Sequence, residues 1–151
     1  LREKKYQEKA MGSKDSGAKT LADMDGFVIG VGQGTTTAEL IEQYAKDKGI
    51  DVNYEVQDFQ YISDGVAALK TGQIDAYSVD RTGLIAYMDD SMMLTEDAFG
   101  VQDIGIALKL GNDELTKFMD DTLTELKESG RLDELKAKWG ILTDEEVAAM
   151  Q

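Results

Sequence analysis

A glycine- and threonine-rich turn, GVGQGTTTAEL at residues 30–40, holds the first residues whose types and spacing could do chemistry. An apolar run at 27–31 precedes the turn, and a helical pattern follows it. A strand that ends in glycines and enters a helix leaves backbone N–H groups unpaired, and the helix dipole adds positive potential there. Such a turn binds anions. Gly34 would let the backbone approach the anion, and the hydroxyls of Thr35 and Thr36 would donate hydrogen bonds to it.

The spacing of the glycines favours a carboxylate over a phosphate. The Gly-Lys-Ser/Thr ending of a phosphate loop is missing, and Thr35 stands where a dinucleotide motif has its third glycine. A second interpretation stays open, in which one of the threonines at 35–37 only caps its own helix.

Asp80, within GQIDAYSVDRTGLIAY at residues 72–87, is the second candidate. It follows an apolar strand and precedes a helix, which places it at the carboxyl edge of a sheet, where ligands of open α/β sheets bind. There it could receive an ammonium group, so that the turn and Asp80 together would hold both ends of an amino acid. Alternatively, Asp80 only caps the next helix. Arg81 would either steer an acidic ligand side chain or pair with an acid on its own helix.

The elements that must position these residues alternate along the chain. Periodicity predicts strands at 27–31, 51–56 and 74–79 and helices at 36–48, 61–70 and 81–88. Short connections between alternating strands and helices indicate a parallel sheet with right-handed crossovers, and therefore an α/β fold. Further on, we expect extended segments at 92–95 and 103–110, a helix at 113–128 capped by Asn112, and a short helix at 132–139.

Composition excludes several classes of function. With 151 residues, 42% of them hydrophobic, the chain is long enough for one domain. Its 16 basic and 30 acidic residues, a net charge of −14, disfavour nucleic acid and anionic membranes as partners. Without cysteine or histidine, thiol and imidazole catalysis and zinc sites are excluded, and we expect neither metal nor cofactor. No apolar run reaches the roughly eighteen residues of a membrane span, and we expect any signal segment to lie outside this chain.

Three stretches resemble a known family. SGAKTLADMDGFVIGVGQGTTTAELI at 16–41, ALKTGQIDAYSVDRTGLIAY at 68–87, and the segment from FGVQDIGIAL at 99 to KAKWG at 140 are similar to amino-acid solute-binding proteins of ABC importers. These proteins have the type II periplasmic binding fold. The resemblance covers the second lobe and the C-terminal return of that fold. It implies a three-layer α/β/α lobe with a mostly parallel central sheet and C-terminal helices packed beside it.

The resemblance also implies roles for single residues. Thr35 and Thr36 would bind the ligand α-carboxylate and Asp80 the α-ammonium group. LREKKYQ resembles the end of a segment in which an arginine clamps the carboxylate, so Arg2 is the matching residue. The implied function is binding of a polar or charged amino acid in the periplasm or outside the cell, for an ABC permease, without enzymatic activity.

Nearly all of the family's first lobe has no counterpart in this sequence. We therefore divide the chain into a remnant of lobe one with a linker (1–19), the ligand-binding lobe two (20–100), and a return strand with C-terminal helices (101–151). A fragment, a chain with residues left out and a natural single-lobe form would all explain this. Two other functions stay open: a sensory or self-associating module, in which the orphaned helix face forms a homodimer, and a dehydratase-like enzyme with Glu55, Asp58 or Asp80 as general acid.

Overall fold

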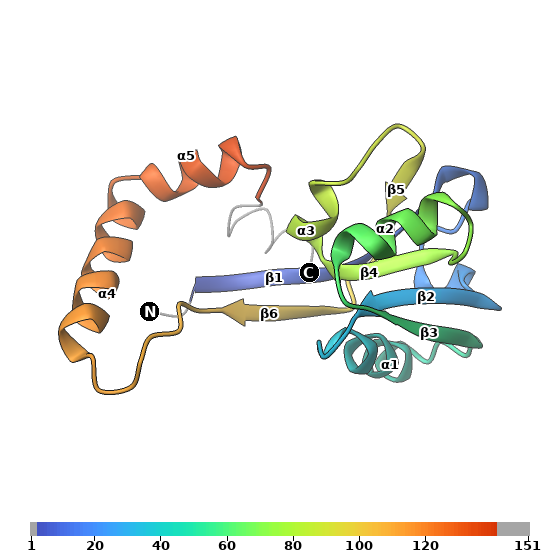
Figure 1. Ribbon diagram of the computed structural model, residues 1–151, viewed down its shortest axis with the longest axis horizontal. Helices are drawn as coiled ribbons and strands as arrows, with labels where there is room; N and C mark the ends of the chain where they lie inside the picture. Colours follow the sequence, from blue (N-terminus) through green and yellow to red (C-terminus); the bar gives the residue numbers. More distant parts are fainter. Residues whose placement is uncertain (1–2, 142–151) are drawn as a thin grey trace. The chain divides into compact units, whose positions relative to one another are not determined.

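The computed structural model describes residues 3–141, with side chains at 8–100 and 105–141 (Figure 1). The chain divides into two compact units. The first, Tyr6–Val101, contains most of the sheet and is called the sheet unit here. The second combines residues 1–5 with 102–151 and is called the C-terminal unit. The sequence boundaries at residues 19 and 100 stay a prediction.

One mixed sheet of six strands is formed within residues 3–141. The order is β3 (Tyr54–Phe59), β2 (Phe27–Gly32), β4 (Ala76–Asp80), β1 (Glu3–Ser13) and β5 (Met92–Leu94), and β6 (Gly100–Ile104) also pairs with β1. The strand β2 is parallel to both β3 and β4, as the alternation of strands and helices predicts. The strand β1 is antiparallel to β4 and β5, which makes the sheet mixed.

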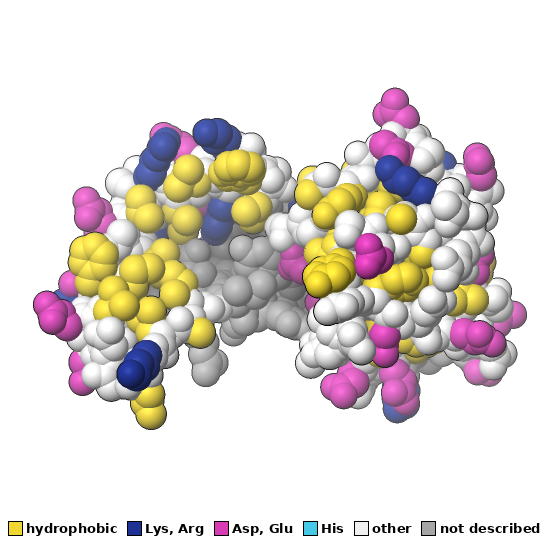
Figure 2. Space-filling model, in the orientation of Figure 1, with side chains coloured by type: hydrophobic (Ala, Val, Ile, Leu, Met, Phe, Trp, Pro, Cys, Tyr) yellow, Lys and Arg dark blue, Asp and Glu magenta, His cyan; other side chains and the backbone are white. Residues whose placement is uncertain are grey.

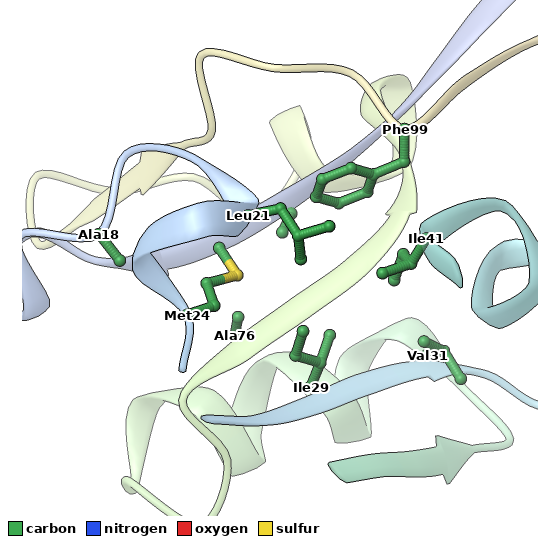
Figure 3. Packing of buried hydrophobic residues seen from close by; sticks show 9 residues of the cluster. Ala18, Leu21, Met24, Ile29, Val31, Ile41, Ala76 and Phe99 are labelled. Carbon is green, nitrogen blue, oxygen red and sulfur yellow. The ribbon is translucent and has the colours of Figure 1, made fainter. Parts of the chain in front are cut away.

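Helices cover both faces of this sheet. The helix α1 (Thr37–Lys48) lies on one face, and α2 (Ile62–Lys70) and the short α3 (Arg81–Ile85) lie on the other (Figure 1). Figure 3 shows Ile41 of α1 pointing toward Ile29 and Val31 of β2. On the opposite face, Val66 of α2 and Leu84 of α3 belong to a second buried cluster. The three-layer α/β/α architecture expected from the sequence is therefore confirmed.

The strand β1 lies in a range that the sequence suggested to be a lobe remnant and a linker. Its residues 8–12 pair with β4 from Asp80 back to Ala76, and its last three residues pair with β5. Ala10 and Met11 are fully buried between the two helical layers. Gly12 and Ser13 belong to the end of β1, and a 3-10 turn follows at Lys14–Ser16. This segment is therefore part of the core.

Local boundaries of several elements differ from the sequence expectation, and β3, for example, covers Tyr54–Phe59 instead of 51–56. The helix α3 ends at Ile85 instead of residue 88, and β6 covers Gly100–Ile104 instead of 103–110. The apolar alternation of 103–110 is typical of a strand with one buried face. However, Ile106 and Leu110 are 52% and 99% exposed. Alternation indicates a surface that could be buried, but it does not supply a partner strand.

The C-terminal unit contains two helices that pack on each other, α4 (Asp113–Glu128) and α5 (Arg131–Lys138). Asn112 caps α4 as predicted, because its Oδ1 accepts a hydrogen bond from the N–H of Leu115 at 3.3 Å. Apolar side chains are visible on both helices (Figure 2), and Phe118 and Trp139 are 62% and 70% exposed. The expected packing of these helices beside the sheet stays a prediction, and the acidic tail beyond residue 141 lies outside the described residues.

Close packing at Gly65 of α2 gives a test of the fold. A Cβ atom at this position would lie 2.1 Å from the ring of Tyr77, which is fully buried and packs edge-on against Phe59 with ring centroids 5.9 Å apart. We expect Gly65→Ala to lower the free energy of unfolding by about 1–3 kcal/mol, because overpacking outweighs the better helix propensity of alanine. Urea unfolding measures the change.

The control is Gly105→Ala, since a Cβ atom there would meet nothing within 4 Å. It should leave the unfolding free energy within about 0.5 kcal/mol. If both variants unfold at the same urea concentration as the original protein, the packing of α2 on Tyr77 is wrong.

Candidate functional site

The turn between β2 and α1 has the geometry that the glycines predict. Gly34 has a φ of +73°, a backbone conformation that residues with a side chain rarely adopt. The N–H of Thr35 donates to the carbonyl of Gly32 at 3.2 Å, which closes the turn. The helix α1 then begins at Thr37, and no side chain caps it at Thr36. Because the first N–H groups of a helix have no carbonyl partner within the helix, this turn presents donors and a positive dipole end.

The threonine hydroxyls form a chain that leads away from the turn into the protein. Thr35 is exposed, and its hydroxyl donates to the carbonyl of Gly32 at 2.7 Å and lies 3.0 Å from the hydroxyl of Thr37. Thr37 is buried, and its hydroxyl donates to Oε2 of Glu8 at 3.3 Å. The alternative interpretation, in which one of the threonines caps its own helix, is seen in part, because the N–H of Thr37 donates to Oγ1 of Thr35 at 3.4 Å. The structure therefore connects the turn to an acidic residue of β1.

Asp80 ends β4, and the structure shows the capping role, while its role in ligand binding stays a prediction. Its Oδ1 accepts hydrogen bonds from the N–H groups of Thr82 at 2.8 Å and Gly83 at 3.4 Å, and from the hydroxyl of Thr82. Asp80 therefore caps α3, as the alternative interpretation states. Its Oδ2 atom, in contrast, is buried and has no hydrogen-bond partner among the described residues. One carboxylate oxygen is fixed by the cap, and the other makes no hydrogen bond within the described part of the chain.

Glu8 is a site residue that the sequence did not indicate. It lies directly opposite Asp80 in the antiparallel pairing of β1 with β4, and only 8% of its surface is exposed. The pKa of its carboxyl is raised from 4.5 to about 7, mainly by burial and also by the charge of Asp80, while the hydrogen bond from Thr37 lowers it. No local signal could have found Glu8, because its neighbour across the sheet is far away in the chain.

Two basic residues flank the carboxylates. Lys9, the next residue of β1, is buried and donates from Nζ to the carbonyls of Thr95 at 2.9 Å and Glu96 at 3.0 Å. Burial lowers the pKa of Lys9, the charge of Asp97 opposes this, and the charge of Arg81 lowers it further. Arg81, at the start of α3, is therefore within electrostatic reach of Lys9. Arg2, the residue matched to a carboxylate clamp, lies outside the described residues.

Three aromatic residues lie on β3 and in the loop that follows it. Tyr54 and Phe59 are partly buried and pack against the two core clusters. Tyr61, at the N-terminus of α2, is 60% exposed. Tyr61 is therefore the member of this group that could contact a ligand.

Together these residues form one edge of the sheet unit, with donors on one side and acceptors on the other. The turn at Thr35 is linked to Glu8 through Thr37, and Glu8 faces Asp80 across the strand pair. Such an arrangement can hold a carboxylate at the helix start and a cation at the carboxylate pair. Within residues 3–141, no three acidic, cysteine or histidine side chains gather as metal ligands would. None of the described helices is both long and apolar enough to cross a membrane.

The sequence also matches known proteins. The L-cystine-binding protein TcyJ of Escherichia coli is 36% identical over 124 residues, which are 80% of this chain and 44% of that protein. The arginine-binding extracellular protein ArtP of Bacillus subtilis is 28% identical over 130 residues, 83% of this chain and 49% of that protein. The chain thus spans less than half the length of these relatives.

Solved structures agree with the fold. The substrate-binding protein of an amino acid ABC transporter matches with a TM-score of 0.71 and 27% identity, over 90% of this chain and 60% of that one. An ancestral arginine-binding protein bound to glutamine matches with a TM-score of 0.70 and 28% identity, over 89% and 60%. The fold is therefore that of the type II periplasmic binding proteins.

A protein-family model also matches most of this chain. The model of the bacterial extracellular solute-binding proteins, family 3, matches residues 30–141, which contain the turn, Asp80 and the C-terminal helices. This family and the relatives are binding proteins, which argues against the dehydratase-like alternative. The chain belongs to family 3 of the bacterial extracellular solute-binding proteins.

Proposed function

We propose that this chain is the amino-acid-binding part of an extracytoplasmic receptor that delivers its ligand to an ABC importer. The observation that carries the proposal is the separation of charge at one sheet edge. Backbone donors at the start of α1 are linked through Thr35 and Thr37 to Glu8. Glu8 is paired across the strands with Asp80, whose buried Oδ2 has no hydrogen-bond partner among the described residues. A free amino acid has the matching pair of groups, a carboxylate and an ammonium, on one carbon atom.

The carboxylate end of the ligand would bind at the turn. The N–H groups of the first turn of α1 supply donors, and Thr36 lies beside them. The hydroxyl of exposed Thr35 would turn from the carbonyl of Gly32 to the ligand carboxylate. Gly34 keeps the turn free of a side chain at its positive-φ position. Binding at a helix start gains both hydrogen bonds and the favourable potential of the dipole.

The ammonium end would bind at Asp80. A hydrogen bond from an ammonium group to a carboxylate is roughly twice as strong as a neutral one. Because Oδ1 already caps α3, the carboxylate does not have to be ordered on binding, and less affinity is lost to entropy. Arg81 stands beside this position and would favour an acidic group on the ligand side chain.

The names of the relatives support this class of ligand. TcyJ is named for L-cystine and ArtP for arginine, and one similar structure is an arginine-binding protein with glutamine bound. From them we infer a polar or charged amino acid, a site in the periplasm or outside the cell, and an ABC permease as partner. We also infer that a first lobe would cover the half-open site, with Arg2 as part of its carboxylate clamp.

Self-association is a second candidate, favoured by the exposure of Phe118 and Trp139 on the helices α4 and α5. Exposed apolar patches of this kind mark interaction surfaces. Light scattering tests the idea, since a homodimer would have twice the 16.6 kDa of one chain. If it forms through this face, Phe118→Ser should return it to a monomer.

Removal of the charge at Asp80 tests the ammonium site. We expect calorimetry to show binding of L-arginine, L-glutamine or L-cystine to the chain. Asp80→Asn should weaken that binding by roughly 10- to 150-fold, because a charge-assisted hydrogen bond contributes about 1.5–3 kcal/mol. Asparagine keeps an oxygen for the α3 cap, so the fold should survive.

Asp89→Asn is the matched control. Asp89 accepts hydrogen bonds from the N–H and the hydroxyl of Ser91, as Asp80 does from Thr82, but it precedes β5. Its replacement should leave the affinity unchanged. Equal affinities for all three proteins would remove Asp80 from the site.

The carboxylate end is tested with an altered ligand. L-Argininamide lacks the negative charge of L-arginine, so it should bind the original chain more weakly. Thr35→Ala should narrow the difference in affinity between L-arginine and L-argininamide, because the variant loses a hydroxyl that would donate only to the ligand carboxylate. Thr71→Ala is the control, since the Thr71 hydroxyl likewise donates to a nearby carbonyl, that of Ala67 at 3.0 Å. If Thr35→Ala weakens both ligands by the same factor, Thr35 does not contact the carboxylate.

A further inference from the structure

Glu8 and Asp80 form an unusual pair of neighbouring carboxyl groups. They are direct partners in the antiparallel register of β1 and β4, so both side chains leave the sheet on the same face. Side chains in such positions have Cβ atoms about 4.5–5.5 Å apart, and like charges placed there repel each other. Glu8 is also buried, which removes the water that would weaken the repulsion.

The hydrogen bonds recorded around this pair do not use all of its carboxylate oxygens as acceptors. Glu8 accepts one bond, from the Thr37 hydroxyl, at the longer distance of 3.3 Å. Asp80 uses Oδ1 for the α3 cap, and its buried Oδ2 has no partner among residues 3–141. A buried carboxylate next to a partly buried one would be costly without a cation between them.

Among the described residues, the groups that shift the pKa of Glu8 are Asp80 and Thr37, together with burial, and no positive charge is one of these causes. Lys9 of β1 is engaged with the carbonyls of Thr95 and Glu96, and the charges that act on it are those of Asp97, Glu96 and Arg81. On the α1 side, Glu8 meets the neutral hydroxyl of Thr37. A proton on Glu8 would lower the repulsion, and burial together with the charge of Asp80 raises the pKa of Glu8 to about 7.

We propose that Glu8 is a second acceptor for the ammonium group of the ligand, that it is protonated in the ligand-free protein, and that the arriving cation displaces this proton. This inference rests on the proposed function, since it concerns the same site. The exchange is balanced: a carboxylic acid and an ammonium ion become a carboxylate–ammonium pair, and one proton goes to solvent.

The proposal fixes the direction in which ligand affinity changes with pH. Binding requires the ionised form of Glu8, so affinity falls when acidification protonates it. Below a pH of about 7, the affinity should drop by up to tenfold per pH unit, and above it the affinity should be nearly constant. Glu8→Gln cannot lose a proton and should show a flatter profile, with its largest loss of affinity at pH 8.

Calorimetry of L-arginine binding at pH 6, in two buffers with different ionisation enthalpies, tests the proposal directly. We expect close to one proton released for each ligand bound by the original chain and none for Glu8→Gln. Glu55→Gln is the control, because Glu55 is an exposed strand glutamate on β3, and it should release the proton as before. N-acetyl-L-arginine, which lacks the ammonium group, should release none.

A second measurement needs no variant. Carboxyl carbon NMR of the original chain should show Glu8 titrating near pH 7 without ligand and at a lower pH with saturating L-arginine. Binding without proton release, or a Glu8 titration that L-arginine does not move, overturns this inference and leaves the proposed function intact. Absence of binding by L-arginine, L-glutamine and L-cystine alike overturns both.

Discussion

The pairing of β1 with β4 is the constraint on which the site depends. The strand β4 lies between β2, to which it is parallel, and β1, to which it is antiparallel, and its residues from Ala76 to Val79 are all buried. Because successive side chains of a strand point to opposite faces, a slip of one residue would move every side chain of β1 to the wrong face. Burial of Ala10 and Met11 on the two faces fixes the register, and that register sets Glu8 opposite Asp80.

The same register places a destabilising pair of carboxyl groups where ligands of such sheets bind. Buried polar atoms without partners each cost about 1–3 kcal/mol, and Oδ2 of Asp80 is one of those found in residues 3–141. A core selected for stability alone would favour apolar side chains at these two positions. The ammonium group of the proposed ligand would offset this cost.

The sheet unit holds the candidate site in place, whereas the C-terminal unit exposes apolar side chains. In the sheet unit, close contacts such as that between Gly65 and Tyr77 hold β4 and its neighbours in place, so that Asp80 and the turn at Gly34 keep their positions. In the C-terminal unit, apolar residues including Phe118 and Trp139 are exposed. An exposed apolar surface of this kind is typical of a protein interface.

Local features of the site were predictable from the sequence, because they depend on neighbours within a few residues. The apolar run of β2, the glycine turn with a positive φ at Gly34, the start of α1 and the cap at Asp80 all follow from local backbone preferences. The α/β fold and the family follow from the order of these motifs. Glu8, Thr37 and the strand β1 were not predictable in the same way. Glu8 meets Asp80 across more than seventy residues of chain, and its environment exists only when the sheet closes in one register. Local sequence thus determined the turn and the acidic cap, and tertiary structure alone decided that a second, buried carboxyl group would stand beside them, since strand register is a property of the whole core.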